Sequence, residues 1–184
     1  SIAAYVGALG VSLATMVANL SSHKRGWDER WEEFSDWAAQ GQALKDTLLG
    51  LVEEDTKAFN AIMSAFQLSK SNDEEKKART VAIQSATRYA TEVPFKVMEV
   101  TFQSFDLIHA MTKEGNPNSI TDAGVGALCA RAAVHGAFLN VKINAAGLSD
   151  KAFAQDIIAR GAALTQQADE REAVILELVH QGIS

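Results

Sequence analysis

The residue whose position most suggests chemistry is Asp55, a carboxylate inside an otherwise apolar stripe. The stripe recurs at helical spacing and contains Leu44, Leu48, Leu51, Phe59, Ile62 and Phe66. At 3.6 residues per turn, all of these lie within about 40° of Asp55. Burial of an unpaired ionised carboxylate costs on the order of several kcal/mol. Asp55 is therefore either a structural carboxylate paired with a neighbouring helix or an acid–base group, whose charge the apolar surroundings disfavour.

A second polar pattern follows one face of the segment 120–144. Asp122 lies near one end of this face and Asn140 and Asn144 near the other, and the middle is filled by the small residues Gly126, Cys129, Ala133 and Gly136. Such a face suits a tight helix–helix contact, and it equally suits a shallow groove for a flat ligand. Asp122 and Asn140 would be roughly 27 Å apart along a helix. They must therefore serve different parts of a long ligand or different sites.

Other catalytic and metal-binding patterns find no support in the sequence. It has no G-x-G-x-x-G after a strand and no Walker loop. Glu177 and His180 fit the Glu-x-x-His of di-iron bundles, but that site needs a second copy, which is absent. The four histidines share no ligand spacing, so we expect no metal.

Composition limits the class of protein further. The chain has 184 residues, which is one domain's length, so we expect a single helical domain over residues 1–184. The net charge of −6 argues against a nucleic-acid partner. A single cysteine, Cys129, excludes a disulfide framework and indicates a reducing compartment, so we expect a cytoplasmic protein.

Periodicity and chain breakers predict an all-α bundle of five or six long, mostly antiparallel helices. The predicted helices cover about 2–21, 28–68, 73–92, 94–114, 120–144 and 150–181. Pro94 either kinks a longer helix or begins a new one. No segment alternates with period two over β-branched residues, so we predict no strands.

The uncharged segment 1–22 is long enough to cross a membrane. Its many small residues, Asn19 and the lack of a basic flank favour a core helix, and we expect no membrane partner. The chain begins at Ser1 without a methionine, so we expect it to be truncated at its N-terminus. Ala3, Gly7, Gly10 and Ala14 share one small-residue face, which we expect to be buried against a second copy in a homodimer.

Four segments carry a family resemblance: 52–59 (VEEDTKAF), 92–94 (EVP), 115–125 (GNPNSITDAGV) and 136–144 (GAFLNVKIN). In this order, over essentially the whole chain, the sequence resembles the cyclodeaminase domain of formiminotransferase-cyclodeaminase and the related stand-alone methenyltetrahydrofolate cyclohydrolases. Ser1-Ile2-Ala3-Ala4 looks like the end of that family's Gly-rich start, and the glycines themselves are absent from this sequence.

The resemblance implies a fold, an assembly and a substrate. It implies an all-α fold, a dimer whose subunits help to form the sites, and a one-carbon derivative of tetrahydrofolate as substrate, with no further cofactor. The favoured reaction is the conversion of 5-formiminotetrahydrofolate to 5,10-methenyltetrahydrofolate and ammonia. The alternative enzyme is methenyltetrahydrofolate cyclohydrolase. A catalytically idle helical module that binds folate or assists assembly is the alternative from a different class.

The residues receive roles from the resemblance and the patterns together. Asp55 is the first candidate for acid–base catalysis, and Asp122 is the second, or else an anchor for the amide-like edge of the pterin. The expected substrate contacts are Ser1, Asn116, Asn140, Lys142, Asn144, Lys24 and Arg25. Of these, Lys142, Lys24 and Arg25 are expected to receive the glutamate tail of the folate.

Overall fold

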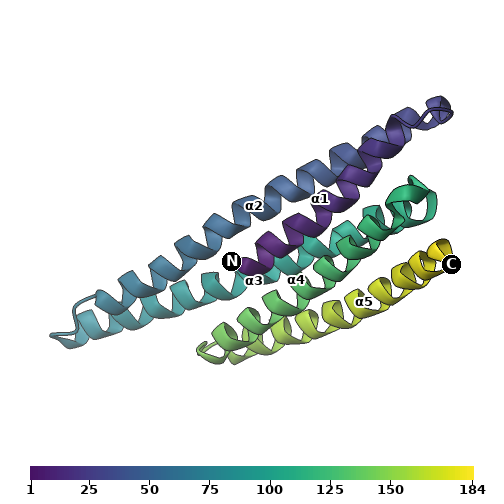
Figure 1. The fold of residues 1–184 in the computed structure, drawn as a ribbon. Coiled ribbons are helices and arrows are strands. Elements are labelled where there is room, and N and C mark those ends of the chain that lie inside the picture. The colour runs from purple at the N-terminus through teal and green to yellow at the C-terminus, as the bar shows by residue number, and fades with distance from the viewer.

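The computed structural model describes residues 1–184 except for the side chain of Asp28, and within this range it contains no strand. Five long helices follow one another: α1 (Ile2–Ser22), α2 (Trp31–Gln67), α3 (Asp73–Glu114), α4 (Ile120–Ala146) and α5 (Lys151–Ile183) (Figure 1). The short 3-10 helices η1 (Asp28–Arg30) and η2 (Pro117–Ser119) lead into α2 and α4. The predicted all-α bundle is confirmed.

The bundle is built from helices of unequal length. α1 packs against α2, α3 and α4, while α5 packs against α3 and α4. α2 and α3 run on past the start of α1 and end in their own turn (Figure 1). We call the projecting part, residues 58–90, the α2–α3 arm.

The contact between α1 and α4 brings two backbones together. A Cβ atom added at Gly10 would lie 2.8 Å from the carbonyl oxygen of Gly126, which no real side chain tolerates. The small residues of α4 therefore form a helix–helix contact over the middle of their face. Gly7 and Ala14 of α1 are also buried inside this chain. The surface proposed from sequence for a second copy was therefore wrong, because α1 buries its small-residue face within its own bundle.

Pro94 does not end a helix. Of the two alternatives that the sequence left open, the structure has the longer helix: α3 continues from Asp73 to Glu114, and the bundle has five long helices. Since proline lacks an N–H, the carbonyl of Ala90 loses its donor four residues ahead. A buried carbonyl without a partner costs about 1–3 kcal/mol. Here Nδ2 of Asn144, on α4, donates to this oxygen at 2.6 Å, so a tertiary contact supports the continuous helix.

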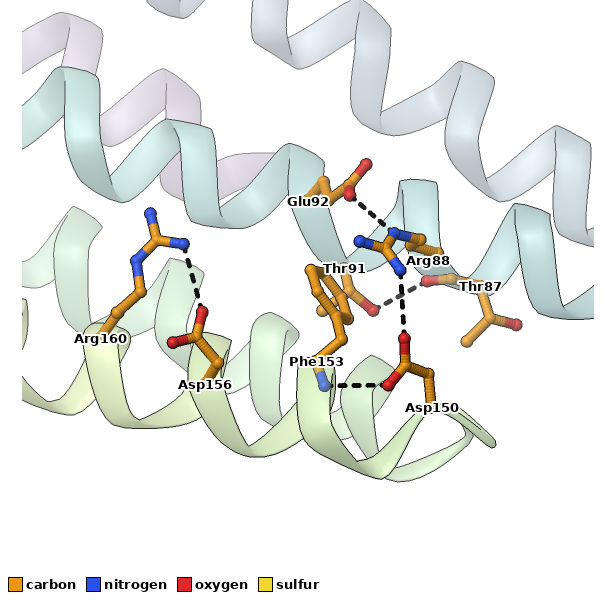
Figure 2. A network of polar contacts seen from close by, with 8 residues as sticks. All are labelled: Thr87, Arg88, Thr91, Glu92, Asp150, Phe153, Asp156 and Arg160. Atoms are coloured by element: carbon orange, nitrogen blue, oxygen red, sulfur yellow. Dashed lines mark hydrogen bonds and ion pairs between the residues drawn. The ribbon is translucent and has the colours of Figure 1, made fainter.

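The start of α5 is held against α3 by polar contacts (Figure 2). Arg88 lies 3.4 Å from Asp150 and 3.8 Å above the ring of Phe153. Asp150 also caps α5 by accepting a hydrogen bond from the Phe153 N–H at 3.0 Å. One turn earlier on α3, Gln84 donates to the carbonyl of Gly147 at 3.1 Å. These contacts fix the turn between α4 and α5, together with the first turn of α5, against α3.

Two segments, Ile2–Ser22 and Pro117–Ala146, are long and apolar enough to cross a membrane by length and composition. They contain the two helices that meet at Gly10 and Gly126. The central helices of a bundle meet the same criteria, and the close packing of α1 on α4 accounts for the small apolar residues in both.

The backbone contact between α1 and α4 predicts opposite effects for two glycine substitutions. Gly10→Ala should lower the free energy of unfolding by about 1–3 kcal/mol, because its Cβ meets backbone atoms that cannot move aside. That corresponds to roughly 2–4 °C in Tm for each kcal/mol in a chain of this size. Gly50→Ala is the control: no described atom lies within 4 Å of the added Cβ, so the change should be neutral or stabilise the helix by up to about 1 kcal/mol. Thermal unfolding followed by circular dichroism measures both, and equal Tm values would contradict this account of the contact.

Candidate active site

Three of the polar residues singled out in the sequence, Asp55, Asn140 and Asn144, meet in a cleft beside the start of α1. The cleft has a volume of about 150 Å³ and takes residues from three helices. Its lining residues are Asp55, Ala58, Phe59 and Ile62 from α2, Ala90 from α3, and Asn140 and Asn144 from α4. We call it the Asp55 cleft. Larger hollows of about 480 and 530 Å³ lie elsewhere on α1, α2 and α3 and are lined by none of the predicted site residues.

The cleft lies beside the start of α1. The backbone nitrogen of Ser1 lies 3.3 Å from the carbonyl oxygen of Val52 and 3.5 Å from Oδ2 of Asp55. Leu48, which lies beside α1, is fully buried, whereas Phe59 on the same stripe is 61% exposed. α1 therefore covers the stripe as far as Asp55, and from there the groove between α2 and α4 is open.

The environment of Asp55 differs from the buried one predicted from the stripe. Its side chain is 37% exposed, and Phe66, further along the stripe, is 52% exposed. The stripe predicted apolar surroundings for Asp55, and the structure instead places its side chain at the wall of an open cleft. A partly exposed carboxylate at the wall of a cleft can contact a ligand, which favours the acid–base interpretation over a buried structural pair.

Asn140 and Asn144 are one turn apart on α4 and face the cleft together. Asn144 donates through Nδ2 to the Ala90 carbonyl at 2.6 Å, and Asn140 donates to Gly136 of its own helix at 3.2 Å. Among the described residues, no donor reaches either Oδ1 atom. The cleft therefore offers two amide oxygens and one carboxylate, all of them acceptors, between the apolar side chains of Phe59 and Ile62. Such a site suits a flat ring that carries N–H groups.

A hydrogen-bonded pair stiffens the wall next to Asp55. Tyr89 of α3 donates to Glu54, and Lys57 lies 2.6 Å from the same carboxylate. The hydrogen bonds from Lys57 and Tyr89 lower the pKa of Glu54, and the bond to Glu54 raises the pKa of Tyr89. This pair joins α2 to α3 one residue away from both Asp55 and Ala90, so the two walls of the cleft are held at a fixed distance.

Four other predicted site residues lie away from the Asp55 cleft of their own chain. Asn116 donates through its backbone N–H to Ser21 at the far end of α1, and its side chain accepts from the N–H of Asn118. Lys24 and Arg25 follow that end of α1, and Asp122 begins α4 beside it. With 21 residues, α1 separates these positions from Asp55 by roughly 32 Å.

Lys142 lies between the two cleft asparagines in sequence but points elsewhere. Its side chain is exposed, and Nζ lies 4.7 Å from the ring centroid of Phe138. This agrees with the 100° per residue that separates Lys142 from Asn140 on the helix. Lys142 is not part of the lining of the cleft.

Sequence reasoning missed the role of Phe59, Ile62 and Ala90 as cleft-lining residues. Phe59 and Ile62 were placed on the apolar stripe with Asp55, and nothing in the stripe itself distinguishes a residue that lines a cleft from one in the core. Ala90 has no signal of its own, but Pro94 indicates an unpaired carbonyl four residues before it.

A family model described as formiminotransferase-cyclodeaminase matches residues 1–163 of this chain. The chain belongs to this family. A methenyltetrahydrofolate cyclohydrolase of Methylorubrum extorquens is 37% identical over 182 residues, which are 99% of this chain and 88% of that protein. A formimidoyltransferase-cyclodeaminase of Rattus norvegicus is 32% identical over 176 residues, and there the chain spans only about a third of the relative's length. The crystal structure of a formiminotetrahydrofolate cyclodeaminase from Thermotoga maritima shares the fold of this family member, with a TM-score of 0.79 and 25% identity over 96% of this chain and 85% of that one.

Proposed function

We propose that this member of the family is a one-carbon enzyme that converts 5-formiminotetrahydrofolate to 5,10-methenyltetrahydrofolate and ammonia. The observation that carries the proposal is the meeting of Asp55 with Asn140 and Asn144 at an accessible cleft with apolar walls. The likeness to the Thermotoga maritima protein, which bears the name of this activity, supports it. The reaction would place the enzyme in histidine degradation, and we expect it in the cytoplasm.

The reaction requires a held geometry and two proton transfers. N10 of the folate attacks the amidinium carbon on N5 and closes a five-membered ring through a tetrahedral carbon. Asp55 takes the proton from N10 and delivers it to the amine of the tetrahedral carbon. This transfer restores the carboxylate of Asp55, and the protonated amine leaves as ammonia. The amide oxygens of Asn140 and Asn144 accept hydrogen bonds from N–H groups of the substrate. Orientation and proton transfer account for the reaction, so we propose no cofactor beyond the folate itself.

A specific observation favours methenyltetrahydrofolate cyclohydrolase as the second candidate. The Methylorubrum extorquens relative that bears this name is matched over 88% of its length, whereas the rat protein is matched over 32% of its length. In this reaction Asp55 would take a proton from water as it adds to the methenyl carbon, and would return it to N5 as the bond between N5 and that carbon breaks, which leaves a formyl group on N10. The tetrahedral centre is similar, so the same side chains serve either chemistry.

The absorbance of methenyltetrahydrofolate separates these functions when each substrate is supplied in turn. Cyclodeaminase activity produces the absorbance from 5-formiminotetrahydrofolate together with ammonia, and cyclohydrolase activity removes it from methenyltetrahydrofolate. Tight folate binding without either change would identify a catalytically idle module and contradict the proposal.

We further propose a homodimer that covers the outer surface of α1 and α4. This apolar face consists of Ile2, Tyr5, Leu9, Met16 and Leu20 from α1 and Val125, Leu128, Leu139 and Ile143 from α4, all exposed. Large uncharged patches of this kind mark interfaces. The α1 positions are spaced almost symmetrically about the middle of the helix, so two copies can pair antiparallel about a two-fold axis.

Antiparallel pairing of α1 has a consequence for the substrate. It brings Lys24 of the partner subunit and Arg25 of the partner subunit beside the start of this chain's α1, where the Asp55 cleft opens. The acidic residues Glu53 and Asp55 at that end favour the approach of a basic turn. The folate tail would then meet the basic turn of the partner subunit. Within one chain, this turn lies roughly 32 Å from Asp55.

Asp55→Asn should lower kcat by about 100-fold or more, the scale expected for loss of a general acid–base group. Glu53→Gln is the matched control, since it removes a carboxylate two residues away that is exposed and outside the cleft. The control should stay within a few-fold of wild type. An Asp55→Asn enzyme as active as the control would rule out this role.

Leu9→Glu should convert the dimer to monomers of 19.8 kDa at micromolar concentration, because it places a charge on the apolar face. Val81→Glu is the control, since Val81 is 63% exposed on the α2–α3 arm, away from that face. Sedimentation velocity measures both variants. A wild-type monomer with full activity, or a dimer that survives Leu9→Glu, would refute the interface.

A mixed dimer tests whether the tail site is shared. Asp55→Asn and the Lys24→Ala/Arg25→Ala double variant are each defective below the KM for a polyglutamylated substrate. When the two are mixed and allowed to exchange subunits, one intact site forms per mixed dimer if the basic turn acts across the interface. Activity no greater than the average of the two parents would place the tail site elsewhere. The recovered activity should fall with rising salt, because exposed charge pairs are screened.

A further inference from the structure

We propose that Pro94 is a positioning residue for the substrate, acting through Asn144 of the Asp55 cleft. This inference rests on the proposed function for its kinetic consequences, but its physical content is a hydrogen bond between two helices. Pro94 lies in the interior of α3, and none of the cleft-lining atoms belongs to it.

The chain of contacts begins with the N–H that Pro94 lacks. The Ala90 carbonyl therefore has no donor from residue 94 and accepts instead from Nδ2 of Asn144 at 2.6 Å. Ala90 is 7% exposed, and Pro94 is buried as well. A carbonyl in such a place needs a partner, so the bond to Asn144 is one that the fold maintains.

The bond determines which atom of Asn144 the ligand meets. A side-chain amide carries its oxygen and its nitrogen on one planar carbon. With Nδ2 held by the Ala90 carbonyl, Oδ1 is the atom left to face another direction, and the amide cannot flip without losing the bond. Asn144 is therefore fixed as a hydrogen-bond acceptor.

Asn140 shows what the same residue type does without this support. Its Nδ2 bonds to the Gly136 carbonyl of its own helix at 3.2 Å, and its side chain is more exposed than that of Asn144. Nothing on α3 orients Asn140. The pair thus offers an internal comparison between an amide held by Pro94 through Ala90 and one that is independent of it.

A fixed acceptor distinguishes ligands by chemical class. Oδ1 of Asn144 favours a group that presents an N–H, such as an amidinium, and disfavours a carbonyl oxygen at the same place, since two acceptors repel. Asp55, the other acceptor in the cleft, acts in the same direction. We infer that Pro94 contributes to the discrimination between 5-formimino and 5-formyl derivatives of tetrahydrofolate.

Pro94→Ala separates this role from simple packing. The variant restores the N–H at residue 94, so the helix supplies the Ala90 carbonyl with its own donor and the amide of Asn144 is released. Removal of a proline from a helix interior is expected to leave Tm unchanged or raised. We expect kcat/KM for the N–H-bearing substrate to fall about tenfold, the scale of one oriented hydrogen bond. The discrimination against 5-formyltetrahydrofolate should fall with it.

A double-mutant cycle identifies the path of the effect. In an Asn144→Ala background, Pro94→Ala should change kcat/KM no further, whereas in an Asn140→Ala background it should retain its full effect. Additive effects with Asn144→Ala would overturn the inference. A stable Pro94→Ala enzyme with wild-type kcat/KM and wild-type discrimination would also overturn it.

A measurement that does not need turnover keeps the inference distinct from the proposed function. The side-chain NH₂ signals of Asn144 in NMR spectra report its bond to Ala90 directly. Their hydrogen exchange should be slow in the wild-type protein and faster in Pro94→Ala, while those of Asn140 should not change. If the wild-type protein turns over neither folate, the proposed function fails and this measurement still decides the inference. Unchanged exchange at Asn144 would refute it.

Discussion

The close approach of α1 and α4 is the constraint on which the rest of the bundle depends. Gly10 and Gly126 allow the two backbones to touch, so α1 lies deep between α2 and α4 and excludes solvent from Leu48. At such a short distance few side chains fit between the helices, and the large apolar residues of α1 must point outward. The close contact of α1 with α4 therefore accounts both for the buried core and for the exposed apolar face on the other side of α1.

The cleft lies beside the start of α1, where Ser1 meets Asp55 and where the groove between α2 and α4 is open. The floor of the site is the part of α3 that Pro94 leaves short of one helical hydrogen bond. The open groove therefore lies beside a carbonyl, that of Ala90, which lacks its donor within the helix. Asn144 donates to this carbonyl, and the bond fixes the orientation of its amide in the groove.

The sequence predicted the helices well because each has its own apolar period and its own turn residues. Asn72 and Asp150 cap α3 and α5, at or next to the predicted starts of these helices. It also singled out Asp55, Asn140 and Asn144, since a polar residue in an apolar or small-residue stripe is visible without coordinates. It left open whether a helix ends at Pro94 and gave no sign that Phe59 is exposed, because helix continuity there depends on a donor from another helix and exposure depends on how neighbouring helices pack. The local pattern of residue types contains neither piece of information.

The character of the cleft explains why one site can serve two related reactions. Asp55, Asn140 and Asn144 line the cleft with oxygen atoms, and the hydrogen bond to Ala90 holds the amide of Asn144 in its orientation. The amidinium of a formimino group and the methenyl bridge of the cyclised folate are both cationic, so acceptors stabilise either substrate before any proton moves. The two chemistries then differ in the nucleophile, N10 in one and water in the other. In the proposed dimer, access of water to the carbon would depend on how completely the ligand and the second subunit close the open end of the groove beside Phe59. On this account, cyclodeaminase and cyclohydrolase activity differ mainly in the access of water to the cleft, and less in the side chains that line it.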